Sequence, residues 1–177
     1  LYEDIKQFPA GSYEIDKKQS KYWTYECSPS GSVDDREVDF LIKDSLRLRK
    51  RADVPLGSYL SGGLDSTILS SLLKPDYTWT VGFSQLNEFE WAEIANSTIG
   101  SNHVQIEINH QQYLDALSEM VLKRREPLSV PNEVIIYLMT KEVKKQNTVV
   151  LSGEGADELF WGYDRIFRSE EHTSELQ

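Results

Sequence analysis

The stretch SYLSGGLDSTILSS, residues 58–71, places two adjacent glycines, one acid and several hydroxyls between two apolar segments. Residues 54–60 have the composition of a buried strand, with Pro55 near its start, where a strand tolerates proline. Residues 66–73 have the apolar composition and spacing of a helix. A strand that enters a glycine turn and leaves it as a helix is typical of a parallel α/β sheet.

Strand and helix patterns alternate along the rest of the chain. Aromatic, β-branched and apolar runs predict strands at 77–83, 103–108 and 148–152. Amphipathic spacing predicts helices over 34–51, 88–100, 111–126 and 132–146, and another helix from 156. The predicted fold class is α/β, a doubly wound parallel sheet with helices on both faces. Ligands bind such sheets at the carboxyl ends of strands, here 54–60, 77–83 and 148–152.

Local signals also predict helix ends and buried side chains. Asp34 or Asp35 is expected to cap the first helix, and Asn132 is expected to cap the helix over 132–146. Gly100 is expected to end the helix over 88–100. On the first helix we expect a buried side made of Val38, Leu41, Ile42, Leu46 and Leu48. Trp79 and Trp91 are expected to be core or half-buried. His103 and His110 are expected to pack at the surface or at a strand end.

Composition sets the class of protein. The chain has 177 residues, 39% of them hydrophobic, and a net charge of −10. This predicts a globular protein with a core, and the acidic balance argues against a surface that coats nucleic acid. No apolar run approaches the roughly 18 residues of a membrane span. Cys27 is the only cysteine, so we expect a free thiol in an intracellular, cytoplasmic protein.

The first glycine-rich exit has the chemistry of a polyphosphate loop. Ser61, Gly62 and Gly63 let backbone amides approach an anion, and the amino end of the next helix adds to that potential. Ser61 and Ser66 add hydroxyl donors. Asp65 repels phosphate unless a cation lies between, so it predicts a Mg²⁺ ligand. The alternative is a plain turn in which Ser66 caps the helix.

The second exit, LSGEGADELFWGY at 151–163, repeats the pattern with more acids. Asp157 is a candidate second metal ligand, and Glu154 a candidate acid, base or ammonia-binding group. The alternative is that the acids only stabilise a helix amino end. Two standard motifs are excluded: the chain has no G-x-x-x-x-G-K-[ST], and the Gly153-Glu154-Gly155 run has Glu158 where a dinucleotide fingerprint needs glycine.

Taken together, residues 1–167 resemble the synthetase domain of glutamine-dependent asparagine synthetases. SGGLDS, residues 61–66, matches the pyrophosphate-loop signature of the wider ATP-pyrophosphatase (PP-loop) group. The 151–163 stretch is more specific, because the family pattern is very close to it, with Trp161 where a glycine is usual. The order of VPLGSYL, TVGF and EPLSVPNEVIIYLM around these loops also agrees.

The resemblance implies an adenine nucleotide alpha hydrolase-like fold and a reaction in two steps. The aspartate side-chain carboxylate attacks the α-phosphorus of ATP to give β-aspartyl-AMP and pyrophosphate, and ammonia then gives asparagine and AMP. The implied pyrophosphate contacts are Ser61, Gly62, Gly63 and Ser66. The implied Mg²⁺ ligands are Asp65 and Asp157. The implied nucleoside contacts are Leu60, Val81, Gly82, Ser152 and Gly153. Glu154 is expected to bind or deprotonate ammonia.

The resemblance also implies a domain order. Residues 1–33 would be an arm leading out of an amino-terminal glutaminase domain that supplies ammonia, and residues 34–167 a truncated synthetase domain. Residues 168–177 resemble a translated sequencing adapter, so we expect a non-native tail. A catalytic lysine is expected beyond Phe167, so we expect the fragment alone to be inactive. The resemblance leaves a homodimer open.

Two other interpretations remain open from the sequence. One is a different amide-forming ligase of the same fold, such as a β-lactam synthetase or a sugar or peptide amidotransferase. The other is a non-catalytic module that binds a nucleotide or a partner. The loop containing Glu154 favours ammonia as the nucleophile.

Overall fold

The computed structural model describes residues 5–24, 26, 34–160, 162 and 163. The chain divides into two units, Leu1–Asp39 and Phe40–Gln177. The first unit contains an antiparallel hairpin of β1 (Ser12–Ile15) and β2 (Lys18–Lys21), joined through Asp16 and Lys17 at positive φ. This hairpin lies within residues 1–33, the segment expected to form an arm. Cys27, Trp161 and the 168–177 tail lie outside the described residues.

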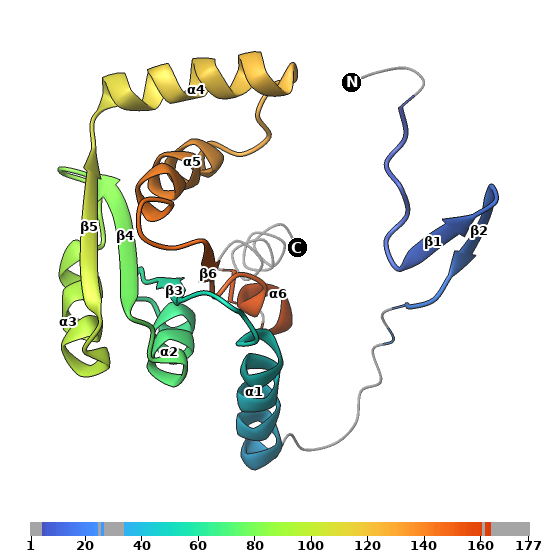
Figure 1. The fold of residues 1–177 in the computed structure, drawn as a ribbon, viewed down its shortest axis with the longest axis horizontal. Coiled ribbons are helices and arrows are strands. Elements are labelled where there is room, and N and C mark those ends of the chain that lie inside the picture. Colours follow the sequence, from blue (N-terminus) through green and yellow to red (C-terminus); the bar gives the residue numbers. More distant parts are fainter. Residues whose placement is uncertain (1–4, 25, 27–33, 161, 164–177) are drawn as a thin grey trace, which may run out of the picture. The chain divides into compact units, whose positions relative to one another are not determined.

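The second unit is built on a four-stranded, all-parallel sheet (Figure 1). Its strands are β3 (Leu56–Tyr59), β4 (Tyr77–Phe83), β5 (Asn102–Ile108) and β6 (Val149–Leu151). Their order across the sheet is β5-β4-β3-β6. The strands predicted at 54–60, 77–83, 103–108 and 148–152 are therefore confirmed, with shorter first and last strands.

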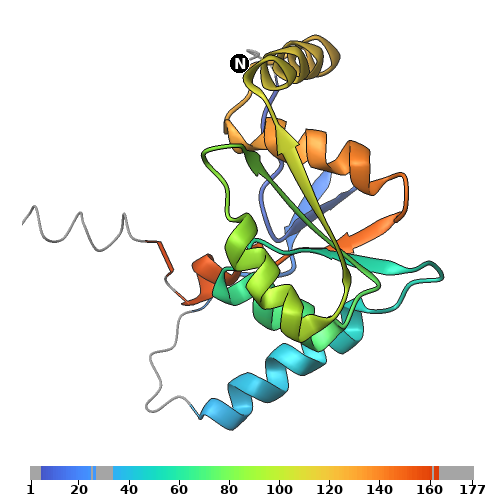
Figure 2. The ribbon, with the colours of Figure 1, turned by 90° about the vertical axis from the view of Figure 1, so that its left-hand side faces the viewer.

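Helices cover both faces of this sheet (Figure 2). On one face, α2 (Leu64–Leu73) packs on β3 and α3 (Phe89–Ile99) packs on β4 and β5. On the other face, α5 (Asn132–Val143) packs on β4, and α4 (His110–Arg124) contacts α5. The remaining helices are α1 (Asp35–Arg49) and α6 (Ala156–Phe160). The predicted doubly wound architecture is confirmed.

The apolar core lies between the sheet and α5. Trp79 on β4 is 1% exposed and packs with Met139 and Val143 of α5. Its ring occupies the space where a side chain on Gly57 of β3 would stand, since a Cβ there would lie 2.7 Å from the ring atom Cη2. Trp91, by contrast, is 63% exposed on α3, so the prediction of burial holds for Trp79 and is wrong for Trp91.

The face of the sheet toward α2 and α3 is more polar. Ser58 on β3 and Ser70 on α2 are both buried, and their hydroxyl oxygens lie 2.7 Å apart. Thr78 and Thr80, which alternate with Trp79 along β4, are buried as well. Strand alternation therefore gives β4 one apolar face and one hydroxyl-bearing face.

Some local expectations differ from the structure. Asp34 does cap α1, accepting the N–H of Arg36 at 2.9 Å. Leu41 and Leu48, which we expected on the buried side of this helix, are 56% and 50% exposed. Among the described residues of α1, Leu46 is the buried one. Asn132 does not cap α5.

The residue before α5, Pro131, already has helical φ and ψ, and it makes no side-chain cap. In the described part of the chain, no helix is both long enough and apolar enough to cross a membrane.

Candidate functional site

The strand order creates a topological switch point. From β3 the chain moves outward to β4 and β5, and it then returns to the opposite side of β3 as β6. The carboxyl ends of β3 and β6 are therefore adjacent at the point where the strand order reverses, which is where parallel α/β sheets bind their ligands. The two glycine-rich exits, residues 60–66 and 152–157, are the segments that follow these two strands.

The first loop directs its polar groups toward one another. The Ser61 N–H donates to Ser66 Oγ at 3.3 Å, and the Gly63 N–H donates to Ser61 Oγ at 3.2 Å. The two hydroxyl oxygens lie 3.0 Å apart, and the Ser66 hydroxyl donates to the Gly63 carbonyl at 3.2 Å. Two amides and two hydroxyls thus lie within hydrogen-bonding distance of one another in one short loop, and such groups are the ones that bind anions.

The amino end of α2 adds to this group of donors. Gly63 is the residue that precedes the helix, and it makes no side-chain cap. Ser66 lies inside the helix rather than before it, so the alternative in which Ser66 caps α2 is wrong. Because the first N–H groups of a helix have no intrahelical partner, the start of α2 attracts negative charge.

Glycine stands at positions 62 and 63 for different physical reasons. Gly62 has φ +86°, and a Cβ there would lie 2.6 Å from the backbone nitrogen of Ala92 at the start of α3. Packing and backbone conformation therefore both require glycine at position 62. A Cβ on Gly63 would meet only Ser61 Oγ, at 3.3 Å. Gly63 is thus the more open of the two and the better placed for a ligand to approach the backbone.

Gly153 brings the second loop against the first. A Cβ on Gly153 would lie 3.1 Å from the backbone nitrogen of Ser66 and 3.2 Å from both the carbonyl carbon and Cβ of Asp65. The chain leaving β6 therefore touches the first turn of α2. The sequence predicted that both loops lie at the sheet edge, and the structure joins them in direct contact.

The acids are distributed around this contact. Asp65 on the first turn of α2 and Asp157 on α6 are half-buried, whereas Glu154 is exposed. The Asp157 carboxyl group lies beside Gly162, where an added Cβ would stand 3.1 Å from Cγ. Among the described residues, no group of three histidine, cysteine or acidic side chains is arranged to hold a metal ion. Any cation here would rely on two carboxylates and the oxygens of a ligand.

The other predicted contacts lie along the same edge. Leu60 is buried, and its N–H donates to the Trp79 carbonyl at 2.9 Å. Val81 packs on the core around Trp79. Gly82 is buried against the loop after β4, where an added Cβ would lie 2.9 Å from Asn87 Cα. Ser152 is exposed beside Gly153. The side chains of Leu60 and Val81 thus belong to the buried part of the sheet.

Sequence reasoning missed a polar group beneath this edge. The hydroxyl of Thr80 donates to the carbonyl of Leu60. His103, which we expected at the surface or packed at a strand end, is half-buried on β5 and contacts the hydroxyls of Thr78 and Thr80. Burial lowers the pKa of His103, and the negative charge of Glu93 opposes this shift. The signal in the sequence was the pair of threonines two residues apart in a strand made otherwise of aromatic residues, valine and glycine.

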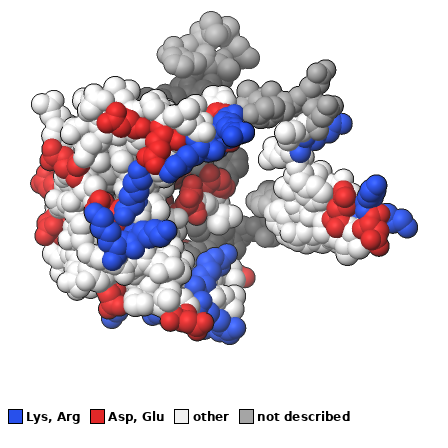
Figure 3. All heavy atoms as spheres, turned by 45° about the horizontal axis from the view of Figure 1, so that its top comes forward, with Lys and Arg blue, Asp and Glu red and all other residues white. Residues whose placement is uncertain are grey.

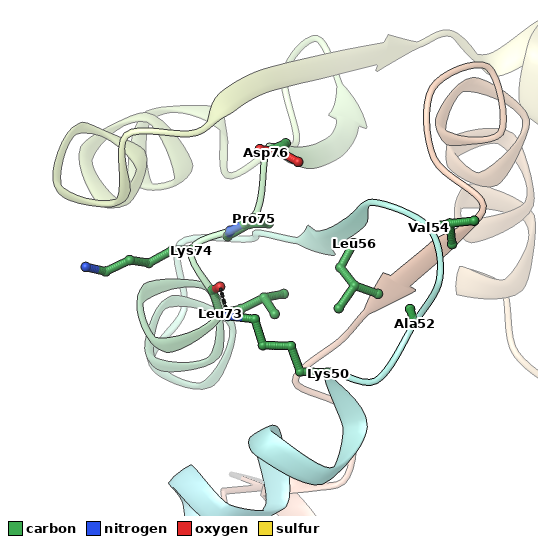
Figure 4. Close-up of a pocket in the computed structure, with 8 residues that line it drawn as sticks. All are labelled: Lys50, Ala52, Val54, Leu56, Leu73, Lys74, Pro75 and Asp76. Atoms are coloured by element: carbon green, nitrogen blue, oxygen red, sulfur yellow. Dashed lines mark hydrogen bonds between the residues drawn. The ribbon is translucent and has the colours of Figure 1, made fainter.

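A separate open pocket of about 230 Å³ lies at the opposite end of the strands (Figure 4). Leu56 at the start of β3, Leu73 at the end of α2 and Asp76 just before β4 line it together with Lys50. The Lys50 ammonium donates to the Leu73 carbonyl at 3.2 Å. This position is remote from the carboxyl ends where the two loops meet.

Comparisons with known proteins agree with this geometry. A family model described as "Asparagine synthase" matches residues 37–177. Asparagine synthetase [glutamine-hydrolyzing] 1 of Bacillus subtilis is 40% identical over 139 residues, which are 75% of this chain and 22% of that protein. A putative asparagine synthetase [glutamine-hydrolyzing] of Mycobacterium bovis is 38% identical over 165 residues, 90% of this chain and 23% of that protein. The chain thus spans less than a quarter of either relative.

Among solved structures, the chain resembles the NH3-dependent NAD synthetase from Campylobacter jejuni. The TM-score is 0.51 at 17% sequence identity, over 75% of this chain and 62% of the other. At this identity the likeness shows a shared fold alone. The family model, which covers most of the chain, shows more: this chain belongs to the asparagine synthase family.

Proposed function

We propose that the protein containing this chain makes asparagine from aspartate and ammonia, using ATP to activate the aspartate side chain. The carrying observation is the contact of Gly153 with Asp65 and Ser66, because it joins two loops of complementary chemistry at the switch point of the sheet. Family membership supports the same reaction, since the similar proteins from Bacillus and Mycobacterium are named asparagine synthetases.

The first loop would hold the polyphosphate of ATP. Ser61, Gly63 and Ser66 already bring two amides and two hydroxyls within hydrogen-bonding distance of one another. Phosphate oxygens would replace the hydroxyl oxygens that now accept from the Ser61 and Gly63 amides, so the amides would change acceptor while the loop kept its backbone conformation. As the aspartate carboxylate attacks the α-phosphorus, negative charge accumulates on the departing pyrophosphate. Fixed amides and hydroxyls stabilise that charge without reorganisation.

Asp65 and Asp157 fit the requirements of a Mg²⁺ site. Both are half-buried carboxylates on the first turns of helices that follow β3 and β6. Hard divalent cations take one or two carboxylates together with phosphate oxygens, which suits a site with few protein ligands. A bound Mg²⁺ would neutralise the leaving pyrophosphate, and the protein would contribute two carboxylates, one from the segment after each strand.

Glu154 would act in the second step. It is exposed on the loop after β6, next to Gly153, and is therefore accessible to a nucleophile that arrives after the first step. Its carboxylate would bind ammonium and accept a proton as nitrogen attacks the acyl carbon of β-aspartyl-AMP. The products are asparagine and AMP. The relatives named above are glutamine-hydrolysing, so we propose a glutaminase domain in the full-length protein as the source of ammonia.

The test is an ATP–pyrophosphate exchange assay on the full-length protein with aspartate, compared with glutamate and other acids. Exchange that depends on aspartate is expected. Asp65→Asn should reduce it by about a hundredfold, the usual loss when one group that stabilises transition-state charge is removed. Asp76→Asn, which removes an exposed acid at the opposite end of α2, is the matched control and should retain exchange.

Glu154→Gln separates the two steps. The variant should retain aspartate-dependent exchange, because adenylation precedes ammonia attack, and it should lose asparagine formation. Exchange with another acid but not with aspartate would contradict the proposal and would point to a different amide-forming ligase of this fold.

A further inference from the structure

Leu60 fixes the exit of β3 into the 61–66 loop through two hydrogen bonds. Its N–H donates to the Trp79 carbonyl at 2.9 Å, and its carbonyl accepts the hydroxyl proton of Thr80. Leu60 is 1% exposed and Thr80 is 4% exposed, so water cannot readily replace either bond. A side chain of β4 therefore holds the residue from which the loop starts.

The Thr80 hydroxyl also faces the imidazole of His103 on β5. Thr80 Oγ1 lies 3.4 Å from Nε2, and Thr78 Oγ1 lies 2.9 Å from Nδ1. Thr78 and His103 are direct partners in the register of β4 and β5. The imidazole thus bridges two hydroxyls that point to the same face of β4.

The same chain of contacts ends at an amide on α3. The Ser101 hydroxyl donates to Asn96 Oδ1 at 2.5 Å, and its oxygen lies 2.7 Å from Thr78 Oγ1. The Asn96 amide nitrogen donates to the Ser101 carbonyl at 3.1 Å, which fixes the orientation of the amide. Both ends of the chain, Asn96 Oδ1 and the Leu60 carbonyl, are oxygens that only accept hydrogen bonds.

Counting protons assigns the tautomer of His103. The contacts are Asn96–Ser101, Ser101–Thr78, Thr78–His103, His103–Thr80 and Thr80–Leu60. Because Ser101 and Thr80 donate to the terminal oxygens, Thr78 must donate to Ser101. The two remaining contacts then need protons from the imidazole, and a neutral ring has only one. The shorter contact is at Nδ1, so that nitrogen carries the proton.

Burial favours this neutral ring, since it lowers the pKa of His103 against the opposing charge of Glu93 on α3. Nε2 then presents a lone pair to Thr80. The Thr80 proton therefore has two possible acceptors, Nε2 at 3.4 Å and the much closer Leu60 carbonyl. In the structure it goes to Leu60, and this choice fixes the start of the loop.

We propose that Thr80 and His103 are positioning residues for the 61–66 loop. Thr80 holds the carbonyl of Leu60, and His103, kept as the Nδ1–H tautomer by Thr78, lies against the Thr80 hydroxyl, donates no proton to it and leaves the Thr80 proton to Leu60. The consequence for activity rests on the proposed function, in which this loop binds the polyphosphate of ATP. The hydrogen-bond chain itself does not depend on that function.

Kinetics of the full-length protein test the role of Thr80. Thr80→Val keeps the shape of the side chain and removes the hydroxyl, leaving the Leu60 carbonyl without its donor. We expect kcat/KM for Mg–ATP in pyrophosphate exchange to fall about tenfold, mainly through KM, as is usual when a buried acceptor loses its partner. Thr80→Ser restores the hydroxyl and should remain within about threefold of the wild type.

Ser70→Ala is the matched control. It removes a buried hydroxyl that contacts Ser58 at 2.7 Å, on the same face of the sheet but outside the chain that ends at Leu60. It should lower stability and leave KM for Mg–ATP unchanged. A folded Thr80→Val variant with the wild-type KM would overturn the proposal, as would an equal rise of KM in Ser70→Ala.

A second measurement does not require activity. Nitrogen-15 shifts of the His103 ring in the full-length protein should show a proton on Nδ1, and Thr78→Val should move it to Nε2. The Ser61 and Gly63 amide resonances should shift in Thr80→Val and return in Thr80→Ser.

A wild-type ring protonated on Nε2 would overturn the assigned tautomer and the role given to His103. Ser61 and Gly63 amides unmoved in Thr80→Val would overturn the positioning role of Thr80. If the wild type lacked exchange activity, the proposed function would fail, while these spectra would still decide the hydrogen-bond chain.

Discussion

At the residue scale, the contact between the two loops depends on one missing side chain. Gly153 lies against backbone atoms of Asp65 and Ser66, and backbone atoms cannot swing aside as the end of a long side chain can. The spacing between the loops is therefore set by glycine at this position. A ligand held by both loops would respond to a shift of a few tenths of an ångström.

Gly153→Ala should therefore separate the loops. Its Cβ would lie 3.1 Å from the Ser66 nitrogen, and relief of this crowding should cost about 1–3 kcal/mol of unfolding free energy. Affinity for Mg–ATP should fall together with stability. Isothermal calorimetry and thermal melts of the full-length protein measure both quantities.

Gly100→Ala is the control for this variant. A Cβ at Gly100 meets nothing within 4 Å, but φ is +78°, so the substitution should cost about 1–2 kcal/mol through backbone strain alone. Its Mg–ATP affinity should be unchanged. Equal affinities for Gly153→Ala and the wild type would show that the contact between the loops does not position the ligand.

His103 should make stability depend on pH in one direction. Burial lowers its pKa from the ordinary value of 6.5, so below that pH the unfolded chain binds more protons than the folded one. Stability should therefore be complete above pH 6.5 and should decrease as the pH falls below it. His103→Gln should flatten this part of the curve in urea unfolding measured at several pH values. An unchanged slope would exclude His103 as the group responsible.

At the scale of elements, a cluster of charges joins α4 and α5. The Glu119 carboxylate accepts hydrogen bonds from Lys123 at 2.6 Å, Lys141 at 2.7 Å and the Tyr137 hydroxyl at 2.8 Å. These bonds lower the pKa of Glu119 to about 2. Acidic and basic side chains lie next to one another on the face shown in Figure 3. The cluster helps to hold α4 on α5, whose other side packs on Trp79.

Glu119→Gln should weaken this connection. Because the folded pKa is lowered, the stabilising effect should be present above the ordinary pKa of 4.5 and should disappear as the pH falls toward 2. The melting temperature at neutral pH should decrease, and the difference from wild type should shrink in about 1 M salt, which screens exposed charges.

Glu142→Gln is the control. Glu142 lies in the last turn of α5, and its carboxylate pairs at 2.6 Å with Lys145, which follows the helix, so this ion pair does not reach α4. It should change the melting temperature less than Glu119→Gln does. Equal and salt-independent effects of the two variants would contradict a cluster that bridges the helices.

At the scale of the whole molecule, the switch point brings together segments that are far apart in the chain. β3 lies between β4 and β6, so the loops bearing Asp65 and Asp157 leave adjacent strands. Neither loop alone supplies the proposed set of two carboxylates, two hydroxyls and two amides. The proposed site therefore exists only when β6 has paired with β3.

A double-mutant cycle of Asp65→Asn and Asp157→Asn tests whether the two acids share one cation. If they do, either variant alone should remove most of the Mg²⁺ dependence of ATP binding, and the double variant should add little. The interaction free energy should then exceed about 0.5 kcal/mol, the usual limit for independent sites. Additive effects would mean that the carboxylates act separately and would contradict the proposed Mg²⁺ site.

The sequence by itself determined the elements and the chemistry of the two exits. Periods of two and of 3.6 residues are local properties, so β4 was predicted with its bounds and the parallel architecture followed from alternation. Glycines, hydroxyls and acids in 61–66 and 152–157 are likewise visible as composition. Local propensity failed where packing decides, as it did for Asn132 at the start of α5 and for the exposed Trp91.

Only the tertiary structure decided the order of the strands, the contact at Gly153 and the packing that requires glycine at position 62. It also decided the hydrogen-bond chain from Asn96 to Leu60, in which His103 takes part. The physical reason is that strand order and side-chain contacts are set by hydrogen bonding and close packing between segments distant in the chain. No local pattern of residues records which segments will meet.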